Sequence, residues 1–166
     1  MTAADDQHVD AYRAAAARLP GGVCVVTVAW RGSVHATTVS SVASVSLRPP
    51  QLLFCVHADS RLAEALEETA RWTLSVLADD QAPVADWLAS YGRPVVGQLH
   101  RVPHTVSALT GGARLDGAAA WFDCETVAVY ESGDHRIVVG GVLDAVQGDA
   151  EAGSLVHLRG RLRPVR

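Results

Sequence analysis

A proline pair ends a long stretch of this sequence that otherwise favours β structure. Residues 34–47 are rich in Val, Thr and Ser, and Pro49-Pro50 follows almost directly. Because proline has no backbone N–H, the chain must turn there before Leu52 to Val56 resumes as a strand. Upstream, Val23 to Trp30 is another β-branched run, joined to the long stretch by the turn residues 31–33. Strands linked by short turns predict an antiparallel β fold.

Two short helices are expected beside these strands. Residues 5–19 carry apolar side chains at helical spacing and end at Pro20-Gly21-Gly22, which predicts an amphipathic helix lying on the rest of the fold. Asp59 or Ser60 can cap a second helix, from residue 61 to about residue 69.

A third helix and a long loop are expected in the middle of the chain. Asp79-Asp80 can cap the helix, with Val84, Trp87 and Leu88 on its inner face. Residues 91–117 contain prolines and glycines without a sustained hydrophobic period, which predicts a loop over the body. Long loops in compact domains often carry function.

The remaining elements are β strands. Residues 119–131 and 136–146 form a hairpin around Ser132-Gly133-Asp134, as the turn residues indicate. Residues 72–77 give a further strand, and residues 155–165 a last strand or a strand and tail. About six or more mostly hairpin-linked strands, with short helices at the edges, predict an antiparallel barrel with helical excursions. At this length, residues 1–166 are expected to form a single domain.

Charge and hydropathy exclude several classes of protein. The formal net charge is −4 and the arginines are scattered, so a nucleic-acid partner is not expected. No apolar run approaches the roughly 20 residues of a membrane-spanning helix, and the acidic first residues lack the apolar core of a signal peptide. We expect a soluble cytoplasmic protein that does not enter a membrane.

The cysteines and histidines do not form a recognisable metal or disulfide pattern. Cys24, Cys55 and Cys124 lie far apart in apolar runs, which is typical of buried free thiols in a reducing compartment. His100 and His104 have the spacing of one helix face, but Pro103 lies between them and no third ligand is near. No metal site is expected.

Hydroxyl groups are dense in the long second strand. Because side chains alternate between the faces of a strand, Thr38, Ser40 and Ser44 share one face and Thr37 and Ser41 share the other. The second face is a core face only from Ala43 onward, where Val45 and Leu47 follow. Hydroxyls on both faces near residues 37–41 fit either a solvated strand or a polar cradle that donates hydrogen bonds to a phosphate or ring carbonyl.

A second group of residues favours an anionic ligand. Ser60 and Arg61 stand at a predicted helix start, just after Cys55-Val56-His57. Helix starts present free N–H groups and the positive end of the helix dipole to anions. The hydroxyl-rich stretch and this helix start are joined by one short strand. Together they suit a phosphorylated ligand.

Three ordered motifs resemble the short-chain flavin reductase family over about Leu19 to Val146. They are the T-x-S-S-x-x-S-V-S-x-x-P-P run from Thr38 to Pro50, the DSR and LSVLADDQ segments, and Gly133-Asp134-His135 followed by an apolar strand with Gly140-Gly141. The resemblance implies a mainly β split barrel with short helices, of the FMN-binding, flavin reductase-like type.

The resemblance also implies an activity and its partners. Such a protein is an NAD(P)H-dependent flavin reductase that transfers hydride from NADH or NADPH to FMN or FAD. It works as a homodimer and supplies reduced flavin to a partner monooxygenase.

Site residues follow from the same motifs. The implied flavin contacts are Thr37, Thr38, Val39, Ser40, Ser41, Cys55, Val56, His57, Ser60 and Arg61. Gly133 and Asp134 would lie in the loop on the nicotinamide side. His135 would be the catalytic residue and would orient the nicotinamide by hydrogen bonding or charge.

The sequence departs from the family in the central loop. Residues 91–115 lack the basic residue followed by Phe that the family often shows, so the preferred flavin and nicotinamide stay open. One alternative is a flavin-binding protein or flavoenzyme of the same fold without reductase activity, and another is a cofactor-free binding domain. Neither a Gly-x-Ser-x-Gly elbow nor a Gly-x-Gly-x-x-Gly loop is present to support a hydrolase or a Rossmann domain.

Overall fold

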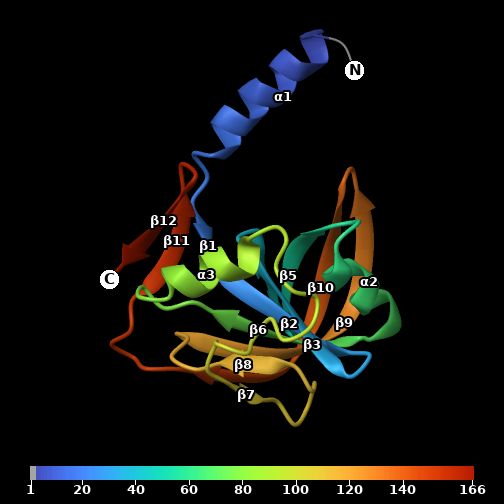
Figure 1. Ribbon diagram of the computed structural model, residues 1–166, viewed down its shortest axis with the longest axis vertical. Helices are drawn as coiled ribbons and strands as arrows, with labels where there is room; N and C mark the ends of the chain where they lie inside the picture. The colour runs from blue at the N-terminus through green and yellow to red at the C-terminus, as the bar shows by residue number, and fades with distance from the viewer. Residues whose placement is uncertain (1–2) are drawn as a thin grey trace.

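A computed structural model describes residues 3–166, which form antiparallel sheets and three helices (Figure 1). The elements in chain order are α1 (Ala3–Ala16), β1 (Gly21–Gly22), β2 (Cys24–Trp30), β3 (Ser33–Val39), β4 (Val42–Leu47), β5 (Pro50–His57), α2 (Arg61–Glu68), β6 (Arg71–Val76), α3 (Ala82–Ala89), β7 (His104–Val106), β8 (Ala113–Leu115), β9 (Ala120–Ser132), β10 (His135–Gln147), β11 (Ser154–Leu158) and β12 (Arg161–Val165). The mainly β architecture with short helices is as the sequence predicts.

The main sheet has seven strands in the order β3-β2-β6-β9-β10-β5-β4. Strands β3 and β4 follow each other in the chain, yet they stand at opposite ends of this order. The chain crosses from one end to the other at Ser40-Ser41. Strand β3, at one end of the order, contacts β5, the second strand from the other end, so the two ends of the sheet approach each other at this point.

The predicted single strand over residues 34–47 is therefore wrong, because two strands with different partners occupy it. Strand β3 pairs with β2, whereas β4 pairs with β5. The assignment of Ala43, Val45 and Leu47 to a core face is also wrong, since β4 is an edge strand and Leu47 is 84% exposed. Pattern alone could not separate the strands, because both halves are equally β-prone.

The proline turn is confirmed and is tighter than expected. Leu47 pairs directly with Pro50, so the turn consists of Arg48-Pro49, whose peptide bond is cis, and β5 begins before Leu52. Proline is tolerated at the first position of a strand because no ladder donor is needed there.

Two hydrophobic clusters form the core, and β2 contributes to both. Cys24, Val26 and Val28 pack into the cluster beneath α2, while Val25 packs into the cluster with α3, as does Val23 just before the strand. This division follows the alternation of side chains along a strand. Both faces of β2 are thus buried, as its unbroken apolar sequence indicates.

Gly140 permits a close contact in the first of these clusters. A Cβ atom at this position would overlap the indole ring of Trp72, which is fully buried. The Trp72 ring also packs edge-on against Phe54, with 4.9 Å between the ring centroids. Gly140, the first residue of the Gly140-Gly141 motif, therefore has a role in packing.

Helix α1 stands away from the body of the molecule (Figure 1), so the prediction that it lies on the rest of the fold is wrong. Tyr12 is 68% exposed and Val9 is 40% exposed. The helix forms as the pattern predicts, but these apolar side chains are left exposed in the described structure. Among the described residues, no helix has the length and apolar character needed to cross a membrane.

Of the predictions for the other two helices, the cap of α2 is confirmed and two features of α3 are wrong. Ser60 caps α2, since its Oγ accepts a hydrogen bond from the Ala63 N–H at 3.1 Å. The predicted Asp79-Asp80 cap of α3 is wrong, because the N-cap is Gln81 and Asp79 pairs instead with Arg166 at 2.9 Å. Trp87 was expected on the inner face of α3 and is 41% exposed.

The hairpin of β9 and β10 is confirmed, with Gly133-Asp134 as its turn, and the last stretch of the chain forms the β11–β12 hairpin. The cysteines are free, as expected. Cys24 and Cys124 are buried, and burial raises the pKa of each thiol to about 12. Cys55 is only partly buried.

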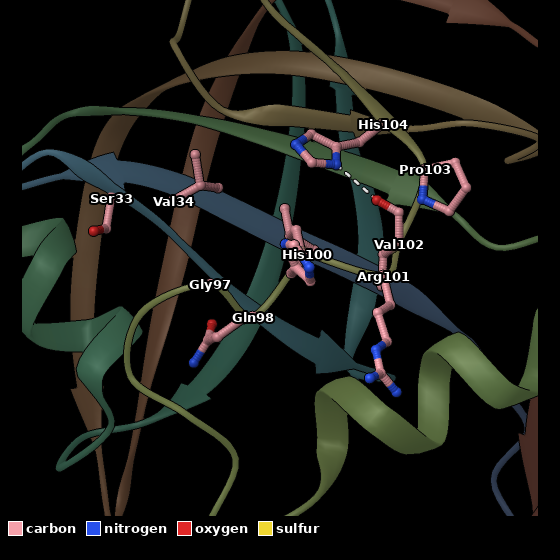
Figure 2. A pocket seen from close by; sticks show the side chains of 10 residues that line it. Ser33, Val34, Gly97, Gln98, His100, Arg101, Val102, Pro103 and His104 are labelled. Carbon is pink, nitrogen blue, oxygen red and sulfur yellow. Dashed lines mark hydrogen bonds between the residues drawn. The ribbon is translucent and has the colours of Figure 1, made fainter.

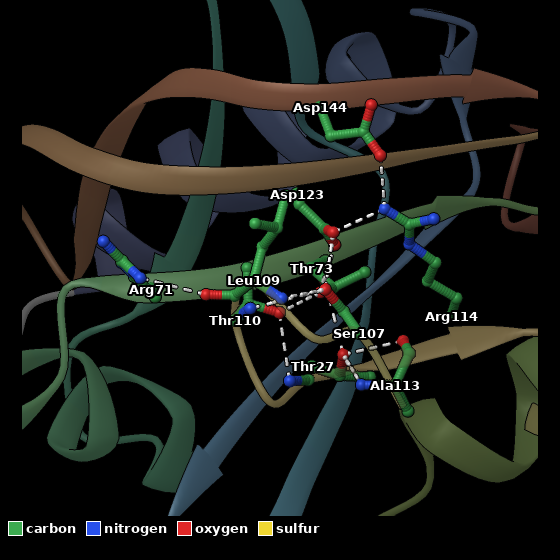
Figure 3. Close-up of polar contacts among 11 residues, drawn as sticks. Thr27, Arg71, Thr73, Ser107, Leu109, Thr110, Ala113, Arg114, Asp123 and Asp144 are labelled. Atoms are coloured by element: carbon green, nitrogen blue, oxygen red, sulfur yellow. Dashed lines mark hydrogen bonds and ion pairs between the residues drawn. The ribbon is translucent and has the colours of Figure 1, made fainter. Parts of the chain in front are cut away.

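A buried polar network holds the central excursion against the main sheet (Figure 3). Asp123 in β9 is fully buried and accepts hydrogen bonds from Thr73 at 2.7 Å and from Ser107 at 2.5 Å. Arg114 in β8 bridges Asp123 at 2.5 Å and Asp144 at 2.6 Å. The network joins β6, β9 and β10 to the β7–β8 segment, so much of the predicted loop is anchored.

Candidate functional site

A cavity of about 580 Å³ opens where the two ends of the main sheet approach each other. Its walls are β3, the end of β5, the start of α2 and the segment after α3. The predicted site residues that line it are Thr37, Thr38, Val39, Ser40, Ser41, Cys55, Val56, His57, Ser60, Arg61 and His135. Gly133 and Asp134 lie in the adjacent β9–β10 turn, outside the lining.

The hydroxyl groups on the β3 wall have two different roles. Thr38 Oγ1 donates to the Ala85 carbonyl of α3 at 2.8 Å, and Thr37 Oγ1 accepts from Arg93 at 2.9 Å. These two hydroxyls therefore hold neighbouring elements in place. No hydrogen bond within the described part of the chain engages the hydroxyls of Ser40 and Ser41, so these two are available to a ligand.

The opposite wall presents the start of α2. Ser60 uses its side chain to cap the helix, and Arg61 follows as an exposed residue with no carboxylate partner among residues 5–166. The Ser60 oxygen thus accepts in the cap while its O–H can still donate, and the guanidinium of Arg61 is available. A free cation beside a helix start favours an anionic group of a ligand.

Arg93 lines the cavity, and the sequence reasoning missed it. Its Nη1 donates to the Ser90 carbonyl at 2.7 Å, and its Nη2 donates to the Ala36 carbonyl at 3.0 Å and to Thr37 Oγ1. The buried Nε has no partner, and burial lowers the pKa of the guanidinium. The only signal in the sequence was a basic residue in the divergent loop, followed by Pro94 where Phe was expected.

His135 and His57 meet at the mouth of the cavity. Their rings are in edge-to-face contact, with centroids 5.4 Å apart. His135 Nδ1 lies 2.7 Å from Asp134 Oδ1, and the hydrogen bond from His135 holds the pKa of that carboxyl below its usual range. The Ala58 N–H donates to the Asp134 carbonyl at 2.9 Å, which fixes the turn beside the end of β5.

His35 lies deeper in the same cavity and was not predicted as a site residue. It is 4% exposed, and its Nδ1 has no hydrogen-bond partner. Burial lowers the pKa of the imidazole, and the nearby Arg61 lowers it further. The ring is therefore neutral near pH 7 and leaves one buried polar atom unsatisfied.

The charged side chains in the cavity lining are positive. Arg61 and Arg93 lie in the wall, and no aspartate or glutamate is present among the lining residues that the structure describes. Polar donors and small side chains make up most of the remainder. The arrangement suits an anionic, planar or hydroxyl-bearing ligand rather than a cation.

A second, more open hollow of about 700 Å³ is formed largely by the loop that follows α3 (Figure 2). It is lined by Ser33, Val34 and residues 97–104 and includes none of the predicted site residues. His104 Nδ1 lies 2.7 Å from the Val102 carbonyl, so this nitrogen is already engaged. The two hollows share Gln98.

Comparison with known families gives a match over most of the chain. The family model described as flavin reductase like domain matches residues 16–166. The chain is 34% identical over 149 residues to the NADH-dependent FMN reductase AsuE2 of Streptomyces nodosus subsp. asukaensis, covering 90% of this chain and 80% of the relative. It is 33% identical over 150 residues to the reductase component of 4-hydroxyphenylacetate 3-monooxygenase of Thermus thermophilus, covering 90% and 92%.

Solved structures agree with this match. BorF, the flavin reductase component of a bacterial two-component tryptophan halogenase, has a TM-score of 0.88 at 37% identity, covering 95% of this chain and 98% of BorF. The Streptomyces globisporus NADH:FAD oxidoreductase SgcE6, solved with NAD and FAD fragments, has a TM-score of 0.89 at 30% identity, covering 96% and 94%.

Proposed function

Because the chain belongs to the flavin reductase-like family, we propose that it transfers hydride from NADH to FMN or FAD and supplies the reduced flavin to a partner monooxygenase. Relatives named as reductase components of two-component monooxygenases support this partner. Relatives named as NADH-dependent reductases favour NADH as the donor.

One observation of this structure carries the proposal: the cavity gathers two arginines, free serine hydroxyls and unsatisfied buried nitrogens, with no carboxylate in its described lining. A flavin phosphate would be held by Arg61 at the start of α2 and by Arg93. Ser40 and Ser41 would donate to oxygen atoms of the flavin. These residue types fit the chemistry of a flavin nucleotide.

The flavin ring, when bound, would accept the hydride, so the protein needs no nucleophile of its own. What the chain contributes is position and charge. Donors fixed in the cavity wall would stabilise negative charge on a bound flavin because they are already oriented. His135 at the mouth, oriented by Asp134, would hold the nicotinamide against the open side of the cavity.

The homodimer is also part of the proposal. Strands β4, β9 and β10 expose large apolar side chains in the described part of the chain. They are Val45, Leu47, Val127, Val129, Tyr130 and Leu143. Large exposed apolar side chains on strands of the same sheet favour a protein interface. We further propose that residues 1–166 act as one domain in the cytoplasm, where the three free thiols would stay reduced.

Anaerobic spectroscopy tests the activity directly. The purified protein is mixed with FMN or FAD and NADH, and the flavin absorbance is followed with time. Catalytic bleaching of free flavin is the expected result. A tightly bound yellow flavin that NADH does not bleach would instead indicate a flavoprotein without reductase activity, and no flavin binding would exclude both.

A further inference from the structure

Gln98 occupies an unusual position in the fold. It lies in the loop after α3 and is only 6% exposed, yet it lines both the candidate cavity and the hollow of Figure 2. Its backbone carbonyl accepts a hydrogen bond from the Trp87 indole N–H at 2.8 Å. A polar side chain buried to this degree normally has all its hydrogen-bonding groups satisfied.

The orientation of the Gln98 carboxamide follows from its one side-chain hydrogen bond. The backbone N–H of Ala36 donates to Gln98 Oε1 at 2.8 Å. A backbone N–H can donate only to the oxygen of a carboxamide, so the Nε2 amino group must occupy the other position. Figure 2 shows the carboxamide directed away from the side chains of His100 and Arg101.

Gln98 and Arg93 together take the place of a neighbouring strand at the edge of β3. Gln98 accepts from the Ala36 N–H, and Arg93 donates to the Ala36 carbonyl at 3.0 Å. Strand β3 is the last in the sheet order, so its outward backbone groups have no strand partner. The two side chains satisfy these groups at Ala36 and hold the loop against the cavity.

The donors of Gln98 remain unused after this bond. No hydrogen bond among the described residues engages Nε2, although the amino group carries two N–H donors. We infer that Gln98 is a flavin-positioning residue whose Nε2 donates to a ring carbonyl or ribityl oxygen of the bound flavin. A neutral amide suits a neutral oxygen, whereas Arg61 and Arg93 suit the phosphate. The inference rests on the proposed function.

Two variants distinguish donation by Gln98 Nε2 from the hydrogen bond that Gln98 accepts from Ala36. Gln98→Glu keeps an oxygen that accepts from the Ala36 N–H but removes the N–H donors, and Gln98→Met removes both groups. Riboflavin is the decisive probe because it lacks the phosphate that an added carboxylate would repel. Binding of riboflavin and FMN is measured by quenching of flavin fluorescence, and thermal unfolding reports on the fold.

Both variants are expected to bind riboflavin and FMN about tenfold more weakly than the wild type, the loss typical of one hydrogen bond. For Gln98→Glu, the KM for NADH should stay near the wild-type value while the KM for flavin rises. If Gln98→Glu binds riboflavin as the wild type does, Gln98 acts only through Ala36 and the inference is wrong. Failure of the wild type to bind any flavin would overturn the proposed function instead.

Discussion

The guanidinium of Arg93 donates to Thr37 Oγ1 across 2.9 Å, which ties the divergent loop to the hydroxyl-rich strand. The contact changes the interpretation of both residues. Thr37 supports the wall of the cavity rather than facing solvent, and Arg93 brings a partly buried positive charge to that wall without a carboxylate partner among residues 5–166.

Replacing Arg93 with Met should weaken FMN binding by about tenfold or more, because a buried charge-assisted hydrogen bond to the phosphate would be lost. The affinity should also depend less on salt than in the wild type. Titrations at low and high ionic strength measure both effects. Arg101→Met is the matched control, since Arg101 lies on the same loop but outside the cavity, and equal affinities in both variants would contradict the role of Arg93.

The Ser40→Val, Ser41→Val double variant tests the polar cradle. These hydroxyls have no partners in the described structure, so their removal should leave the fold intact and weaken flavin binding by about tenfold. Circular dichroism checks the fold, and fluorescence titration measures the affinity. Ser44→Val on the exposed edge strand β4 serves as the control. Unchanged affinity in the double variant would place the flavin contacts elsewhere.

His135→Ala should raise the KM for NADH by about tenfold while flavin affinity stays within about twofold, because His135 stands at the mouth of the cavity. Steady-state kinetics with NADH varied at saturating flavin provide the measurement. His100→Ala, an exposed histidine outside this cavity, should behave as the wild type. Wild-type kinetics in the His135 variant would reject its role.

Asp123→Asn should lower the free energy of unfolding by about 2–3 kcal/mol, since the fully buried carboxylate binds Thr73, Ser107 and Arg114. Urea unfolding measures this loss. Asp116→Asn, at an exposed position, should change stability by less than about 0.5 kcal/mol. A similar loss in both variants would show that the network contributes nothing specific.

The same carboxylate predicts a pH dependence. Burial alone would raise the pKa of Asp123, but hydrogen bonds from Arg114, Ser107 and Thr73 outweigh it, and the pKa lies below the usual value. The folded chain therefore holds this proton less tightly than the unfolded chain. The stabilisation is complete above the unfolded pKa of about 4 and disappears as the pH falls through the lower folded pKa. The stability of Asp123→Asn should fall less over this acidic range.

Local chemistry allowed the sequence to predict most elements of the fold. The proline turn, the Ser60 cap and the Gly133-Asp134 hairpin turn depend on a few adjacent residues, and the structure contains all three. The sequence motifs also singled out residues of β3, β5 and the start of α2 that line the candidate cavity.

Only the tertiary structure decided what lies between these motifs. The sequence pattern predicts one strand where the structure has β3 and β4. Their positions at opposite ends of the sheet depend on pairing partners far away in the chain. Arg93 and Gln98 gave no motif, since their roles arise from contact with Ala36 across more than fifty residues of sequence. Backbone propensity and capping act over a few residues, so the sequence shows them directly. Burial, exposed sheet edges and unpaired charges depend on which distant segments come into contact. In this protein the cavity and its lining form only where the two ends of the sheet approach each other.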